Sequence, residues 1–190
     1  MVISRCLKEN FVPLEKISGS SWRIRFSAYP ETAPVLDSEG NPTGETKETG
    51  WLIYTAEVVF SEPTPEIVRK VRMEELAKYD NSDAVNAFFY NGKKMWFDKL
   101  TRTSISHSIE VEKSSGKETT ELYDNDGVKY ILPVDEALSL FDQVELYAKD
   151  CYNQTAYHKV QLAALDDVDA LLAYDIKAGY PEKLHFGVSE

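Results

Sequence analysis

The chain has 190 residues, a net charge of -11 at pH 7 and a pI of about 4.8. Hydrophobic residues make up 43% of it and charged residues 28%, which is the composition of a globular protein rather than of a disordered chain. Because an acidic surface repels phosphate backbones and anionic lipid, we expect neither nucleic acid nor a membrane as a partner.

The first residues do not read as a targeting signal. Arg5, Lys8 and Glu9 introduce charge too early for a secretory signal peptide, and no apolar run is long enough to predict a membrane helix. We therefore expect the chain to stay in the cytoplasm of the cell that makes it. Cys6 and Cys151 fit no metal-binding or redox spacing, so we expect two reduced thiols, with Cys151 packed on a helix face.

The first sixty residues predict β-strands. Large apolar and polar residues alternate over 22–29, and residues 51–60 are rich in aromatic and β-branched side chains, as is typical of strands. The polar segment 30–50 between them predicts a long connection or a protruding hairpin, mobile in either case. So few strands make a thin sheet, and we expect this N-terminal β unit (1–62) to depend on the second part of the chain or on a partner.

A connecting helix is predicted within residues 63–82. Thr64 suits the capping position, Pro65 suits the first helical position, and the helix should continue to about Lys78. Its apolar residues form only a partial stripe, which is typical of a connector.

Residues 83–190 predict a domain of the order ββαββα. Asn91-Gly92 supplies the positive-φ residues of a tight hairpin turn between 88–90 and 93–97. A short helix over 101–109 and a second hairpin with its turn at 124–127 follow, and then a long helix from about Asp135 to Ala164. The aspartates of 166–169 predict the start of a last helix. The expected fold class is α+β, a small N-terminal antiparallel β unit followed by this domain with its long C-terminal helix.

No group of side chains has the spacing of a catalytic or metal site. His107, His158 and His185 lie far apart in the sequence, and no serine elbow or phosphate-binding glycine loop occurs. The segment 124–127 lacks the first and last ligands of a calcium loop, and a hairpin turn explains it. We therefore expect no enzyme activity, no cofactor and no metal, with a small hydrolase as the remote alternative.

Aromatic residues are dense in the predicted strands, and most of them should belong to the core. Strands with aromatic residues on both faces leave one set for a partner, and interfaces are rich in Tyr and Trp. Trp22, Tyr29, Trp51 and Tyr54 are therefore the candidate partner-binding residues. Stacking of Trp22 and Trp51 on a glycan or receptor is the alternative interpretation, and an overhang of the long helix would serve self-association.

Three segments of the second part carry a family resemblance. They are the Asn91-Gly92 hairpin, Trp96-Phe97-Asp98 before a short helix, and residues 145–152 of the long helix. Across residues 83 to 180 the chain resembles a phage-associated domain family of unknown function that occurs in tail and tail-fibre genes. Residues 9–15 and 179–184 also resemble prophage proteins of gut Bacteroidetes.

These matching residues serve packing and turns, so the resemblance carries over no catalytic site. It implies a non-catalytic structural or assembly protein of a phage or prophage tail. Such a protein would act by protein–protein contact, with tail or tail-fibre proteins as partners, in the host cytoplasm during assembly or in the virion.

Overall fold

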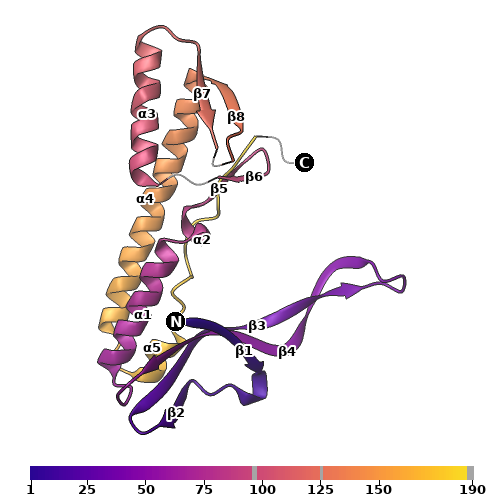
Figure 1. The fold of residues 1–190 in the computed structure, drawn as a ribbon, viewed down its shortest axis with the longest axis vertical. Coiled ribbons are helices and arrows are strands. Elements are labelled where there is room, and N and C mark those ends of the chain that lie inside the picture. Colours follow the sequence, from indigo (N-terminus) through magenta and orange to yellow (C-terminus); the bar gives the residue numbers. More distant parts are fainter. Residues whose placement is uncertain (96–97, 125, 188–190) are drawn as a thin grey trace. The chain divides into compact units, whose positions relative to one another are not determined.

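A computed structural model of the chain describes residues 1–95, 98–124 and 126–187. Helices make up 41% of it and strands 34%, so the predicted α+β class is confirmed, with strands first and a long helix near the end (Figure 1). The elements in chain order are β1 (Val2–Leu7), η1 (Lys8–Asn10), β2 (Leu14–Ser18), β3 (Ser21–Leu36), β4 (Pro42–Val59), α1 (Pro65–Asp80), α2 (Asp83–Asn86), β5 (Phe88–Tyr90), β6 (Lys93–Met95), α3 (Lys99–Ser114), β7 (Thr119–Tyr123), β8 (Lys129–Pro133), α4 (Val134–Ala164), α5 (Val168–Ala173) and β9 (His185–Phe186).

The described residues form two compact units, and neither unit is a continuous piece of chain. Unit 1 holds residues 1–76 and 158–176, and unit 2 holds the described residues of 77–157 and 177–190. The helix predicted for the segment 63–82 is α1, which contributes residues to both units. Residues 158–176, which the sequence groups with the C-terminal domain, are part of unit 1.

Unit 1 is built on an antiparallel sheet with the strand order β1-β4-β3-β2. β1 pairs only with residues 51–56 of β4, and β2 only with residues 21–24 of β3. The outer halves of β3 and β4 therefore run on as a two-stranded ribbon, residues 31–50, which we call the arm (Figure 1). Of the two predicted alternatives for residues 30–50, the structure has the protruding hairpin.

A β-bulge separates the sheet from the arm. Phe26 pairs with Thr55 and Tyr29 with Ile53, so two residues of β3 oppose one residue of β4. In the bulge, Ser27 has a backbone φ of 52°, which residues other than glycine rarely adopt. Because of the extra residue, Tyr29 lies on the same face of the sheet as Phe26, whereas strict alternation would turn it to the opposite face.

The core of unit 1 lies on the face of the sheet that carries Ile24 and Phe26, which are buried. α5 lies against β3, and the guanidinium carbon of Arg72 in α1 is 5.0 Å from the centre of the Phe26 ring. α1 begins at the predicted residue, because Thr64 Oγ1 accepts a hydrogen bond from the Ile67 N–H at 3.4 Å. The helices of unit 1 contribute the buried residues Val68, Leu162 and Leu171 to this core.

Unit 2 contains two hairpins and parts of the long helices. The turn between β5 and β6 has φ values of 49° at Asn91 and 73° at Gly92, which confirms the predicted tight turn. The predicted extension of β6 to Trp96 and Phe97 lies outside the described residues, as does Asn125 in the turn between β7 and β8.

α2 is a short helix that the sequence interpretation did not predict. Of the two longer helices that follow it, α3 differs from the prediction in its bounds. α4 ends at Ala164 as predicted, but α3 covers residues 99–114 rather than 101–109. The extension has a capping residue that the sequence interpretation missed, since Asp98 accepts hydrogen bonds from the N–H groups of Leu100 and Thr101. The main core of unit 2 joins β5, α3, β8 and α4 through buried Phe88, Ile109, Leu132 and Phe141.

Candidate functional site

The four predicted partner-binding aromatic residues have different surroundings. Tyr54 is 7% exposed and packs edge-to-face on Phe11 at 5.6 Å, so its own chain covers it and it is not part of a contact surface. Trp22 and Trp51 are half-buried. A Lys16 ammonium lies 5.6 Å from the Trp22 ring centre and an Arg5 guanidinium lies 4.3 Å from the Trp51 ring centre. Each tryptophan therefore has a cation of its own chain over a ring face that a sugar would otherwise stack on.

Tyr29 is the exposed member of the four, and it belongs to a larger surface. Residues paired across neighbouring strands project to the same side, so Tyr29 and Ile53 lie on one face, together with Ile3 and Trp51. Ile3 is 76% exposed and Tyr29 is 48% exposed. We call Ile3, Tyr29, Trp51 and Ile53 the aromatic patch. It lies at the base of the arm, where Arg5 Nη1 donates to Glu31 Oε1 at 3.3 Å.

Sequence reasoning missed Ile3 and Ile53 as members of this surface. β1 lacks an alternating pattern, so only its pairing with β4 identifies the face on which Ile3 lies. The signal that was present is the aromatic density of residues 51–54, which points to the strand but not to its exposed face.

Unit 2 has a cleft of about 310 Å³ between the end of α1, α2, the start of α3 and the middle of α4. Its mainly apolar side, which we call the floor, consists of Val85, Val144, Tyr147, Ala148 and Cys151. The walls are polar, and the side chains that form them are those of Asp80, Asn81, Asn86, Asp98, Lys99 and Arg102.

The ionisable groups in the floor of the cleft are protonated at neutral pH. Burial raises the pKa of the Cys151 thiol, so the thiol stays protonated and is a poor nucleophile at neutral pH. Burial also raises the pKa of Tyr147, whose hydroxyl donates to the Val85 carbonyl at 2.8 Å. Both groups therefore stay protonated at neutral pH.

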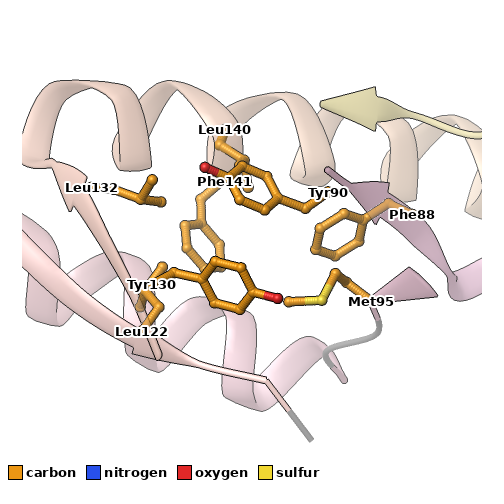
Figure 2. Close-up of a pocket in the computed structure, with 8 residues that line it drawn as sticks. All are labelled: Phe88, Tyr90, Met95, Leu122, Tyr130, Leu132, Leu140 and Phe141. Carbon is orange, nitrogen blue, oxygen red and sulfur yellow. The ribbon is translucent and has the colours of Figure 1, made fainter. Parts of the chain in front are cut away.

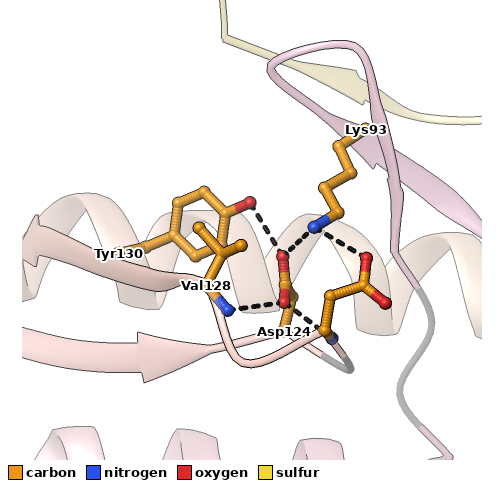
Figure 3. Close-up of polar contacts among 5 residues, drawn as sticks. Lys93, Asp124, Val128 and Tyr130 are labelled. Carbon is orange, nitrogen blue, oxygen red and sulfur yellow. Dashed lines mark hydrogen bonds and ion pairs between the residues drawn. The ribbon is translucent and has the colours of Figure 1, made fainter.

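A buried carboxylate joins the two hairpins of unit 2 (Figure 3). The Lys93 ammonium binds the carboxylate of Asp124 and lies 3.0 Å from Asp126 Oδ2. The Tyr130 hydroxyl donates to Asp124 Oδ2 at 3.0 Å, and the N–H groups of Asp126 and Val128 donate to Oδ1 at 2.8 and 2.9 Å. We call Lys93, Asp124 and Tyr130 the clasp.

The two charges of the clasp stabilise each other. The Lys93 ammonium is the main cause that lowers the pKa of Asp124 to about 2, and the Asp124 carboxylate is the main cause that raises the pKa of Lys93. Lys93 therefore stays a cation at neutral pH and has no free lone pair with which to attack a substrate.

Because of the clasp, we expect the stability of unit 2 to fall with pH in the acid range. The Asp124 pKa of about 2 lies below the value of about 3.9 for an unfolded aspartate. The ionised carboxylate thus makes its full contribution to the free energy of unfolding above about pH 5, and this contribution is lost as the pH falls towards about 2. Thermal unfolding of the wild type and of Asp124→Asn from pH 7 to pH 2 should show a difference in Tm that shrinks below about pH 4.

Asp126→Asn is the matched control, because the Asp126 side chain is 74% exposed against 3% for Asp124. It should lower Tm less than Asp124→Asn at pH 7. A difference between the wild type and Asp124→Asn that stayed constant down to pH 2 would contradict the role of the ionised carboxylate.

An apolar cavity of about 20 Å³ lies inside the main core of unit 2 (Figure 2). Apolar and aromatic side chains from both hairpins and from α4 surround it, namely Phe88, Tyr90, Met95, Leu122, Tyr130, Leu132, Leu140 and Phe141. It has room for about one water-sized group and no polar partner for a water. We interpret it as a packing void.

The three histidines occupy separate places. His158 is 1% exposed with its Nδ1 2.7 Å from the Tyr174 hydroxyl, His185 stacks on Phe89, and His107 is exposed beside Glu110. Across residues 1–95, 98–124 and 126–187, no three His, Cys, Asp or Glu side chains gather as metal ligands would. In the same part of the chain, no helix has the length and apolar composition that crossing a bilayer requires.

Comparisons with known proteins leave the family open. No protein-family model, no curated protein and no solved structure matches this chain.

Proposed function

We propose that this chain is a non-catalytic structural or assembly protein of a phage or prophage tail and acts by protein–protein contact. The aromatic patch at the base of the arm is the observation that carries the proposal. Interfaces are rich in exposed Tyr and Trp side chains on rigid elements, and the patch lies on paired strands. The family resemblance of residues 83 to 180 supplies the tail context.

The arm supports the proposal in a second way. A two-stranded ribbon is marginally stable by itself, and a partner that pairs with it or packs on it would stabilise it. Residues 31–50 contain five acidic residues and one lysine, a net charge of -4. We therefore infer a partner with a basic surface, because an acidic ribbon attracts positive charge.

α4 gives a further surface for self-association. Leu146 and Tyr157 are 62% and 54% exposed, and their spacing of about three turns puts them on one side of the helix.

The proposal that the chain belongs to a phage tail can be tested on phage particles and assembly intermediates, purified after induction of the prophage in the host strain. We expect quantitative mass spectrometry to detect the chain in tails or in tail intermediates, cross-linked to a tail protein. A chain that is absent from both, and that light scattering shows to be a monomer without partners, would contradict the proposal.

A charge placed in the aromatic patch should weaken partner binding. Tyr29→Glu and Ile3→Glu should each lower the affinity about tenfold or more, because a carboxylate in the centre of an interface is desolvated. Val58→Glu is the matched control, since Val58 is also exposed in the sheet but its pairing with Arg23 puts it on the opposite face. Equal losses for all three variants, measured by calorimetry, would exclude the aromatic patch as the contact.

A further inference from the structure

The cleft of unit 2 has the size and composition of a small-ligand site. Its volume of about 310 Å³ falls at the lower end of the range for such sites, and its floor is mainly apolar while its walls are polar. All the described residues that line it belong to unit 2. The charges of its walls indicate the class of ligand.

Of the four charged wall residues, Arg102 forms an ion pair, Asp98 caps a helix and Lys99 is exposed to solvent. Arg102 Nε donates to Glu145 Oε1 at 2.9 Å, which neutralises its charge. Asp98 accepts from the N–H groups of Leu100 and Thr101 at 2.9 and 3.0 Å as the cap of α3. Lys99 is exposed.

Asp80 is the fourth charged residue of the cleft walls. Its Oδ1 accepts a hydrogen bond from Thr155 Oγ1 at 2.6 Å, and no cation of the described residues forms an ion pair with it. Asp80 is also the last residue of α1, so the negative end of the dipole of that 16-residue helix lies at the same place. The carboxylate and the helix end both favour a positive charge in the cleft.

The Asp80 carboxylate is held in position by hydroxyl groups. Thr155 is 2% exposed and donates to Asp80, so its own oxygen accepts from the Tyr180 hydroxyl, 2.7 Å away. An oriented carboxylate loses little freedom when it binds a cation. Tyr152 also lines the cleft and offers an aromatic ring to a cation.

We propose that this cleft binds an organic ammonium ion, a primary amine on a short apolar chain. The ammonium group pairs with Asp80, and the alkyl chain covers Val85, Val144 and Ala148. A free alkylamine and the side chain of a lysine share this chemistry. The site is separate from the aromatic patch and does not depend on the function proposed above.

The test is a titration of the full-length, isotope-labelled protein with n-butylammonium chloride at constant ionic strength, followed by NMR. We expect shifts of the amide signals at the cleft and a Kd of about 1–10 mM, which is ordinary for so small a ligand. Butan-1-ol has the same apolar chain without the charge, and it should bind at least about tenfold more weakly.

Asp80→Asn removes the charge and keeps an oxygen that accepts from Thr155, so it should weaken butylammonium binding about tenfold. Asp142→Asn is the matched control, an exposed carboxylate of α4 outside the cleft, and should leave binding unchanged. Ala148→Leu, which fills the floor, should abolish binding even if Asp80→Asn misfolds. Equal binding of butan-1-ol, or binding that survives both Asp80→Asn and Ala148→Leu, would overturn the proposal.

A second ligand distinguishes the two sources of the amine. Nα-acetyl-lysine methylamide should shift the same amide signals as butylammonium if the cleft accepts a lysine side chain of a protein. Shifts from butylammonium alone would support a free amine as the ligand. Shifts from neither ligand would overturn the proposal.

Discussion

Arg72→Met should lower the free energy of unfolding of unit 1 by about 3–5 kcal/mol, as measured by urea denaturation. The Arg72 side chain is fully buried, and its Nη1 donates to Ser27 Oγ at 2.8 Å. Its guanidinium also binds the Glu75 carboxylate and the Tyr174 carbonyl. Methionine fills a similar volume but leaves the Glu75 carboxylate without its cation in a site where it is 7% exposed.

Arg69 provides the matched control on the same helix. It also binds two backbone carbonyls, of Leu162 and Leu165, and the carboxylate of Asp166. Its side chain is 25% exposed and Asp166 is 93% exposed, so water replaces part of what Arg69→Met removes, and we expect a loss of about 1 kcal/mol.

The double variant Arg72→Met/Glu75→Gln isolates the cause. It should recover part of the stability lost by Arg72→Met, because no unpaired charge remains buried. A double variant that is less stable than Arg72→Met would show that lost hydrogen bonds, rather than the isolated carboxylate, dominate the effect.

Phe141→Ala should lower the free energy of unfolding of unit 2 by about 3–5 kcal/mol. Phe141 is 1% exposed and belongs to the core cluster that joins the hairpins to α3 and α4. It also lines the apolar cavity, so alanine would enlarge a void that already exists rather than open one in filled space (Figure 2). The surrounding aromatic rings are large and collapse poorly into such a space.

Two further variants of α4 show how much of the stability lost in Phe141→Ala comes from the burial of the ring rather than from a change in helix propensity. Phe141→Leu keeps most of the volume and should cost clearly less than Phe141→Ala. Leu146→Ala removes an apolar side chain that is 62% exposed and should change stability by about 0.5 kcal/mol or less. Similar losses for Phe141→Ala and Leu146→Ala in thermal unfolding would contradict the position of Phe141 in the core.

Local signals in the sequence predict much of the fold. Thr64-Pro65 marks the start of α1, Asn91-Gly92 marks the turn between β5 and β6, and a stripe of apolar residues from Ala137 to Thr155 marks most of α4. Each signal depends on residues within a few positions of one another, so a single sequence contains it.

Features that depend on distant pairing could not be predicted. The bulge at Ser27 decides the face of Tyr29, and no turn residue marks it. Tyr54 is covered by Phe11, which lies 43 positions earlier in a segment without a strand pattern. Asp80 and Thr155 are 75 positions apart, and their hydrogen bond exists only because unit 2 brings α1 and α4 together.

The interleaved order of the two units has a consequence for synthesis on the ribosome. Residue 76 completes the first segment of unit 1, but α5, which lies against β3, follows only after about 90 more residues have been translated. At ordinary rates of translation that interval lasts roughly 5–20 s. The nascent sheet spends this time without one of its covering helices, and a chaperone or an early partner has that period in which to bind it.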